Sequence, residues 1–138
     1  MSKKSDDRLD ALFAAAKAAQ AQAYAPYSRF RVGAALRTPS GAAFSGCNVE
    51  NAAYPEGACA EANAIGAMAL AGERRIVDIV VVGDGEDLCT PCGGCRQRIR
   101  EFADAATRVH VAGLAGVRAS FALEELLPHS FGPGHLGR

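Results

Sequence analysis

An almost unbroken apolar run over residues 76–82 sets the strongest constraint on the fold of this chain. A run of this kind is typical of a strand that is buried on both faces, which requires a layer of helices on each side of the sheet. Three stretches with helical patterning can supply those layers, over residues 7–22, 59–71 and 92–103. The chain is therefore predicted to stack helices and strands in α/β layers.

The other segments complete the order of elements. Turn residues at 39–41 join a predicted strand over residues 30–36 to a second over residues 42–49, which indicates a β-hairpin. A further strand is predicted over residues 109–112 and a short helix over residues 123–127. The order helix, hairpin, helix, strand, helix, strand predicts an α/β sandwich with a mixed sheet. We expect one domain over residues 1–138.

Charge and cysteine content narrow the class of protein. Fifteen basic and fifteen acidic residues cancel to a formal net charge of zero, which disfavours binding to nucleic acid. No apolar stretch is long enough for a membrane span, and the first residues lack the apolar core of a signal peptide. We therefore expect a cytoplasmic protein, whose five cysteines are thiols or metal ligands rather than disulfides.

Two cysteine motifs carry the chemistry of the sequence. They are Cys59-Ala60-Glu61 and Pro91-Cys92-Gly93-Gly94-Cys95, and each begins a predicted helix. Free amide groups and the helix dipole favour thiolates there, so lowered thiol pKa values are expected. Three protein ligands leave the fourth tetrahedral position for water, which is typical of a catalytic zinc site. The sequence thus predicts one Zn²⁺ per chain on Cys59, Cys92 and Cys95, with the pKa of its water lowered toward roughly 7.

Glu61 gives this candidate site an acid–base group. It follows Cys59 by two residues, close enough to reach a bound water and pass protons to a substrate. A ligand-x-Glu motif followed by Pro-Cys-x-x-Cys is the signature of zinc deaminases. A structural four-cysteine site that includes Cys89 is an alternative, although it leaves Glu61 without a role. Otherwise Cys47 and Cys89 are interpreted as small apolar residues. The histidines are interpreted as structural or solvent-facing: His110, His129 and His135.

Five motifs in order resemble those of the small three-cysteine cytidine deaminases. Besides the two cysteine motifs they cover residues 27–35, 46–51 and 125–132. The resemblance implies a three-layer sandwich with a five-stranded mixed sheet flanked by helices, assembled as a homotetramer with shared active sites. It implies hydrolytic deamination of cytidine and 2'-deoxycytidine to uridine and 2'-deoxyuridine with release of ammonia, a step of pyrimidine salvage.

The same resemblance implies roles for residues around the substrate. Asn48 and Glu50 correspond to the pair that hydrogen-bonds the ribose, and a pair spaced by two at a strand end also points the same way. Phe30 corresponds to a surface that stacks on the pyrimidine. Tyr54 and Phe131 correspond to residues that close the pocket, often that of a neighbouring subunit.

Further implied roles concern the base and the metal. The backbone of Ala60 and the carbonyl of Thr90 correspond to contacts with the base and its amino group, and Gln97 to a donor to a zinc-bound sulfur. Many relatives carry an arginine after Cys-Ala-Glu that offsets the thiolate charge, whereas this chain has Ala62. Arg96, directly after Cys95, and the N-termini of the two predicted helices are the candidates to supply the missing charge.

Three other functions compete with cytidine deamination. A related zinc deaminase could act on another aminated heterocycle such as blasticidin S, and would differ in having no ribose to contact. A non-catalytic, zinc-stabilised assembly module would have no use for Glu61. A nucleic-acid editing enzyme is disfavoured by the zero net charge.

Overall fold

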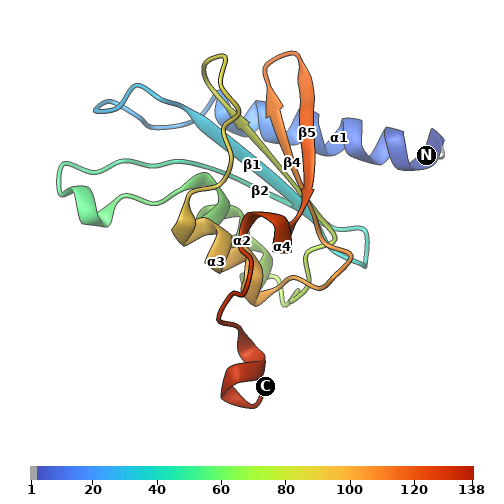
Figure 1. Cartoon of the computed structure of the whole chain (residues 1–138). Coiled ribbons are helices and arrows are strands. Elements are labelled where there is room, and N and C mark those ends of the chain that lie inside the picture. The colour runs from blue at the N-terminus through green and yellow to red at the C-terminus, as the bar shows by residue number, and fades with distance from the viewer. Residues whose placement is uncertain (1–2) are drawn as a thin grey trace.

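The sheet is the frame on which every other element is placed. The computed structural model describes the backbone of residues 3–138 and the side chains from residue 7 onward. Five strands form one sheet in the order β2-β1-β3-β4-β5 (Figure 1). Only β3 and β4 run parallel among these pairs, so the sheet is mixed as predicted. The strands are β1 (Val32–Arg37), β2 (Ala43–Cys47), β3 (Asp78–Gly83), β4 (Arg108–Gly113) and β5 (Gly116–Ala122).

Helices cover both faces of this sheet. One face carries α1 alone, and the other carries α2, α3 and the short α4 (Figure 1). Two single 3₁₀ turns, η1 and η2, lie outside these layers. The three-layer prediction is thereby confirmed. The bounds are α1 (Lys3–Gln20), η1 (Tyr54–Glu56), α2 (Ala60–Leu70), α3 (Gly93–Glu101), α4 (Leu123–Leu126) and η2 (Pro133–Leu136).

Each face of the sheet has its own apolar core. On the α1 face, Leu12 and Ala16 pack with Val80 and Val82, and on the other face Met68 and its neighbours pack with alternate strand residues. The side chains of β3 therefore point into both cores, and five of its six residues are buried. This confirms the prediction that residues 76–82 contain a strand buried on both faces.

Two glycines let a helix approach the sheet on each side. A Cβ at Gly33 of β1 would fall against the backbone of α1 at Ala16 and Gln20. A Cβ at Gly46 of β2 would lie within 2.7 Å of backbone atoms of Ala60 and Ala64 in α2. Since α2 begins beside the first cysteine motif, Gly46 sets how closely that motif lies against the sheet.

A row of polar side chains crosses the α1 face at the end where β3 begins. Arg37 donates to Asp78 at 2.6 Å, and His110 bonds Asp78 through Nε2 at 2.8 Å and Ser120 through Nδ1 at 2.7 Å. Burial alone would raise the pKa of Asp78, but its bonds with His110 and Arg37 outweigh this and lower it. The row links β1, β3, β4 and β5, which confirms the structural interpretation of His110.

The pattern of apolar residues in the sequence did not predict β5. β5 contains arginine, serine and alanine with a single aromatic residue, and it lies at the sheet edge with two exposed positions. Its weak alternation explains why only the resemblance implied a fifth strand. Helix α1 also begins at Lys3, earlier than predicted. Within the part of the chain that is described, no helix combines the length and apolarity needed to cross a bilayer.

Candidate metal centre

Three cysteine sulfurs meet where α2 and α3 begin. Cys59 is the N-cap residue of α2, Cys92 is the N-cap residue of α3, and Cys95 lies in the first turn of α3. All three sulfurs lie within 4.8 Å of one another, and those of Cys59 and Cys92 are 4.0 Å apart. Tetrahedral zinc with Zn–S bonds of about 2.3 Å places sulfurs roughly 3.8 Å apart. The three cysteines are thus positioned to bind one zinc ion, as predicted.

The surrounding protein acts on the three thiols in opposite directions. Burial raises the pKa of Cys59 and Cys95, whereas the backbone N–H of Cys95 lowers the pKa of Cys92. The predicted lowering at helix starts therefore holds for Cys92 and is wrong for the other two. Removal from water outweighs the helix dipole at those two positions. Since zinc binding must release the thiol protons, zinc affinity is expected to fall with falling pH.

Glu61 lies in the first turn of α2 and is 4% exposed. Burial raises the pKa of its carboxyl, and the positive charge of Arg98 lowers it in part. A carboxyl group whose pKa is raised is better suited to accept and then donate a proton than one that stays fully ionised. Its position in α2, two residues from Cys59, places a buried ionisable side chain at the cluster, which a purely structural metal site does not need.

Arg96 and Gln97 do not contact the sulfurs as the sequence suggested. Arg96 donates from its three side-chain nitrogens to the Pro91 carbonyl at 2.7 Å, the Leu126 carbonyl at 2.7 Å and the Thr90 hydroxyl at 3.1 Å. Gln97 donates to the carbonyl of Phe131 at 2.8 Å. Both residues follow Cys95 by only one or two positions, so the turn of α3 directs them away from its sulfur. They tie α3 to the preceding loop and to the C-terminal segment.

Asn48 and Glu50 lie together at the end of β2 and bind the segment before β1. Asn48 accepts from the N–H of Val32 and donates to the carbonyl of Phe30, both at 2.9 Å. Glu50 accepts from the N–H groups of Tyr27 and Ser28 at 2.9 and 3.0 Å and also from the Ser28 hydroxyl. These bonds lower the pKa of Glu50, the Ser28 hydroxyl most strongly. Both side chains thus fix the segment that carries Phe30.

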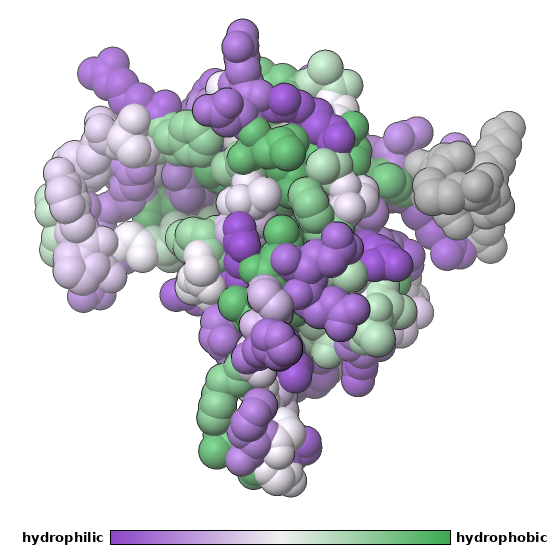
Figure 2. All heavy atoms as spheres, in the orientation of Figure 1, coloured by the Kyte–Doolittle hydropathy of each residue, from purple (hydrophilic) through white to green (hydrophobic). Residues whose placement is uncertain are grey.

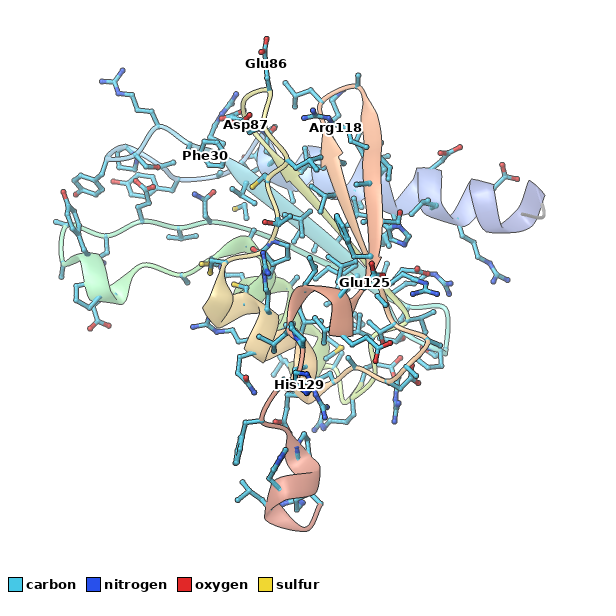
Figure 3. The ribbon with its side chains drawn as sticks, viewed as in Figure 1. Phe30, Glu86, Asp87, Arg118, Glu125 and His129 are labelled. Carbon is cyan, nitrogen blue, oxygen red and sulfur yellow. The ribbon has the colours of Figure 1, made fainter. Side chains whose placement is uncertain are left out.

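Aromatic side chains around this segment are exposed. Phe30 lies at the end of the sheet beside the loop that carries Glu86 and Asp87 (Figure 3). Tyr54 and Phe131, predicted to close the pocket, are 76% and 57% exposed and belong to segments that project from the sandwich (Figure 1). A cavity of about 370 Å³ includes Glu50 and Tyr54 in its lining. The site is therefore open on the side where these aromatic residues lie.

Ala60, Thr90 and Cys89 complete the surroundings. Ala60 is the first residue of α2 and is fully buried, and Thr90 lies in the loop that leads to α3. Cys89 lies against Gly83, and burial raises the pKa of its thiol to about 11. The metal cluster found among the described side chains consists of Cys59, Cys92 and Cys95 without Cys89. The four-cysteine alternative therefore lacks support.

Comparisons with known proteins agree with this geometry. The sequence matches the family model of the cytidine and deoxycytidylate deaminase zinc-binding region over residues 6–112. It is 41% identical to the cytidine deaminase of Sporosarcina psychrophila over 123 residues, which cover 89% of this chain and 90% of that protein. This chain belongs to the cytidine deaminase family.

Solved structures of cytidine deaminases share the fold. The crystal structure of the enzyme from Burkholderia pseudomallei has a TM-score of 0.82 and 44% identity, covering 88% of this chain and 98% of that one. The enzyme from Mycobacterium leprae gives 0.74 and 38% identity, covering 87% and 97%. The five-stranded mixed sheet with its helices is thus the cytidine deaminase architecture.

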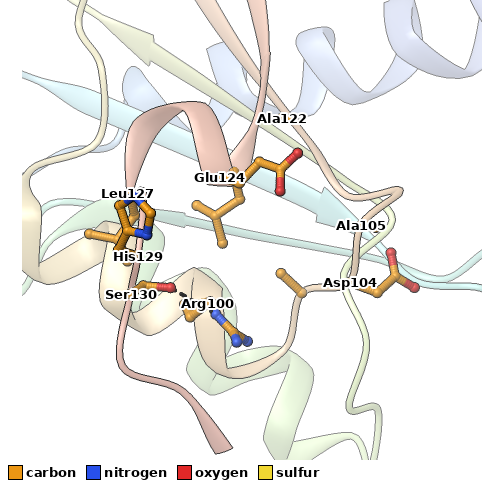
Figure 4. A pocket seen from close by; sticks show the side chains of 10 residues that line it. Arg100, Asp104, Ala105, Ala122, Glu124, Leu127, His129 and Ser130 are labelled. Atoms are coloured by element: carbon orange, nitrogen blue, oxygen red, sulfur yellow. Dashed lines mark hydrogen bonds between the residues drawn. The ribbon is translucent and has the colours of Figure 1, made fainter. Parts of the chain in front are cut away.

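A second cavity of about 370 Å³ lies apart from the metal centre. Arg100 donates to Ser130 at 3.0 Å along one side of it, and Asp104 and His129 lie at opposite ends (Figure 4). The residues that line it come from the end of α3, from the β5–α4 connection and from the segment after α4. They include none of the three metal-site cysteines.

Sequence reasoning missed one residue at the metal centre. Arg98 extends Nη1 to 3.6 Å from the sulfur of Cys95. The signal that could have found it is helical spacing, because a residue three positions after Cys95 lies on the same side of α3.

Proposed function

We propose that this chain catalyses the hydrolytic deamination of cytidine and 2'-deoxycytidine to uridine and 2'-deoxyuridine, with release of ammonia. The observation that carries the proposal is the buried carboxyl of Glu61 beside three sulfurs placed for zinc. The names of the relatives support the same reaction. The chain would act as a single domain over residues 1–138.

The proposed mechanism assigns proton transfer to Glu61. Zinc bound by the three cysteines supplies a Lewis acid that makes water nucleophilic at neutral pH. Glu61 accepts a proton from the attacking water and gives it to the ring nitrogen beside carbon 4. It then takes the remaining proton from the hydroxyl added at carbon 4 and passes it to the amino group. The bond from carbon 4 to nitrogen breaks, a carbonyl forms and ammonia leaves. The carbonyl of Thr90 and the backbone of Ala60 orient the base, and Phe30 stacks on it.

Ribose recognition is proposed for Asn48 and Glu50. Their hydrogen bonds to the segment that carries Phe30 support this, since one strand end then positions both a stacking surface and polar groups. Carboxylate and amide oxygens each retain lone pairs that can accept from a sugar hydroxyl. Blasticidin S as a substrate would make no use of such a ribose contact.

We further propose a homotetramer with shared active sites that works in cytoplasmic pyrimidine salvage, without nucleic-acid or membrane partners. The exposed rings of Tyr54 and Phe131 support self-association, because exposed aromatic residues on projecting segments are suited to covering a neighbour's pocket. Apolar surface is also visible on the projecting C-terminal segment (Figure 2). Sedimentation velocity of the zinc-loaded chain and of Phe131→Ala measures the assembly.

The substrate proposal is tested by a spectrophotometric assay with cytidine, 2'-deoxycytidine, cytosine and blasticidin S. We expect turnover of both nucleosides and much less of the free base. A matched variant, Glu50→Gln, keeps the size of the side chain and should lower kcat/KM for the nucleosides while leaving any turnover of cytosine little changed. Preference for blasticidin S would contradict the proposal, and a zinc-loaded chain inactive on all four would favour the assembly module.

A further inference from the structure

The zinc centre carries more negative charge than its ion neutralises. Three thiolates exceed the charge of Zn²⁺, and the carboxylate of Glu61 lies beside them whenever it is ionised. Ala62, the residue after Glu61, offers no cation to the cluster. A buried group of charges is costly unless an opposite charge and hydrogen bonds compensate it. The compensating cation must therefore come from another position.

Arg98 is a cation placed at the cluster. It lies on α3 one turn after Cys95, and its Nη1 is 3.6 Å from the Cys95 sulfur. Gly94 leaves room for this approach, because a Cβ there would lie 3.2 Å from the same Nη1. The charge of Arg98 also reaches Glu61, whose pKa it lowers. The side chain thus folds back along α3 toward the metal ligands although the residue is exposed overall.

The neighbouring arginine is committed elsewhere. The guanidinium of Arg96 donates to Pro91, Thr90 and Leu126, which hold the loop and the C-terminal segment on α3. Turning it toward the sulfurs would break these bonds, two of which are 2.7 Å long. Of the two arginines that flank Gln97, Arg98 is therefore the one whose guanidinium contacts the sulfur of Cys95.

We propose that Arg98 is a positioning residue of the zinc centre, which donates to the thiolate of Cys95 and balances its charge from α3. An arginine at position 62 of α2 is then not required, because Arg98 supplies the positive charge from α3. The proposal rests on the zinc site and is independent of which substrate the enzyme accepts.

The first test measures zinc affinity by competition with a chromophoric chelator at constant pH. Outer groups that hydrogen-bond metal ligands are worth about ten- to a hundredfold in affinity, and we expect about tenfold for Arg98→Met because its side chain is partly hydrated. Arg98→Lys keeps the charge and should lose less. Arg118→Met makes the same chemical change on β5, away from the cysteines (Figure 3), and should leave affinity unchanged.

A second measurement separates the charge from simple packing. In the cobalt-substituted protein, loss of a hydrogen bond to Cys95 raises the energy of its sulfur electrons, so the sulfur-to-cobalt charge-transfer band should move to longer wavelength in Arg98→Met. The double variant Arg98→Met with Ala62→Arg returns a cation from α2 and should recover most of the zinc affinity. Urea unfolding of each zinc-saturated variant checks that the fold is kept.

Two results would overturn the proposal. One is zinc affinity of Arg98→Met within twofold of the natural chain. The other is weakened affinity with an unmoved cobalt band and no recovery from Ala62→Arg, which would show that Arg98 acts by packing alone. A chain that binds zinc as expected but turns over no cytidine would contradict the proposed function and leave the role of Arg98 intact.

Discussion

Two carboxyl groups on opposite faces of the sheet, the partly buried Asp78 and the buried Glu61, have their pKa values shifted in opposite directions. Asp78 on the α1 face bonds His110 and Arg37, and these partners lower its pKa despite burial. Glu61 on the α2–α3 face is raised by burial, with only partial relief from Arg98. Partners that hold a carboxylate charged stabilise structure, whereas burial that favours the protonated form prepares a group for proton transfer.

The same contrast extends to the two helical layers. On the α1 face a single helix meets the sheet through apolar contacts, and the polar residues satisfy one another across four strands. On the other face the starts of α2 and α3 converge and bring three sulfurs together. We therefore expect the α1 layer to serve stability alone and the layer of α2 and α3 to serve both stability and chemistry. Three predictions test this division.

The largest effect is expected from Glu61→Gln. The amide keeps the shape of the side chain but cannot accept the proton of the attacking water, so turnover should fall about a hundred- to ten-thousandfold. Zinc content and the urea unfolding midpoint should stay close to those of the natural chain. Steady-state kinetics on metal-analysed protein measures the loss. Retention of more than about a tenth of the activity would contradict the role of Glu61 as acid–base group.

Replacing Gly33 and Gly46 by alanine compares the two helical layers directly, because Gly33 faces α1 and Gly46 faces α2. Gly33→Ala and Gly46→Ala should each lower the free energy of unfolding by about 1–3 kcal/mol, because both push a helix backbone away from the sheet. Only Gly46→Ala should also lower kcat/KM, by about tenfold, since it displaces the first turn of α2 that carries Glu61. Equal activity losses in the two variants would show that the layers are not separable in this way.

The smallest effect is expected from Asp78→Asn, measured as stability against pH. The folded pKa of Asp78 is lowered, so its stabilisation is present above about pH 4 and is lost as the pH falls through the folded value. At neutral pH the variant should be less stable by about 1–3 kcal/mol, and this difference should shrink toward pH 3. Both chains release zinc in acid, so the difference between their urea midpoints isolates Asp78. Unchanged kcat/KM at pH 7 is the matching expectation for the α1 face.

The sequence predicted the metal centre well because the geometry within each of its two motifs is local. Cys59 and Cys92 were expected at helix starts and are the N-cap residues of α2 and α3. The spacing from Cys92 to Cys95 spans one turn, which brings two sulfurs to one ion. The strand within residues 76–82 was equally readable, because an almost unbroken apolar run of this length is typical of a strand buried on both faces.

Side-chain contacts between residues far apart in the sequence could not be predicted in this way. Nothing near Arg96 in the sequence shows that Leu126, 30 residues later, takes one of its donors. Adjacency to Cys95 suggested Arg96, whereas helical spacing selects Arg98. The engagement of Asn48 and Glu50 with the segment before β1 was equally hidden, since it depends on how that segment folds back.

The position of the cysteines along the chain gives zinc a mechanical role. Cys59 and Cys95 are 36 residues apart, and the segment between them includes all of β3, the central strand of the sheet. A zinc ion bound to both closes this segment into a ring and restricts the unfolded chain as a covalent cross-link does. Any opening that separates α2 from α3 must also release the metal. Release of the metal, and with it loss of activity, should therefore occur together with unfolding around β3. Damaged copies of the enzyme are expected to unfold rather than persist as folded, inactive protein.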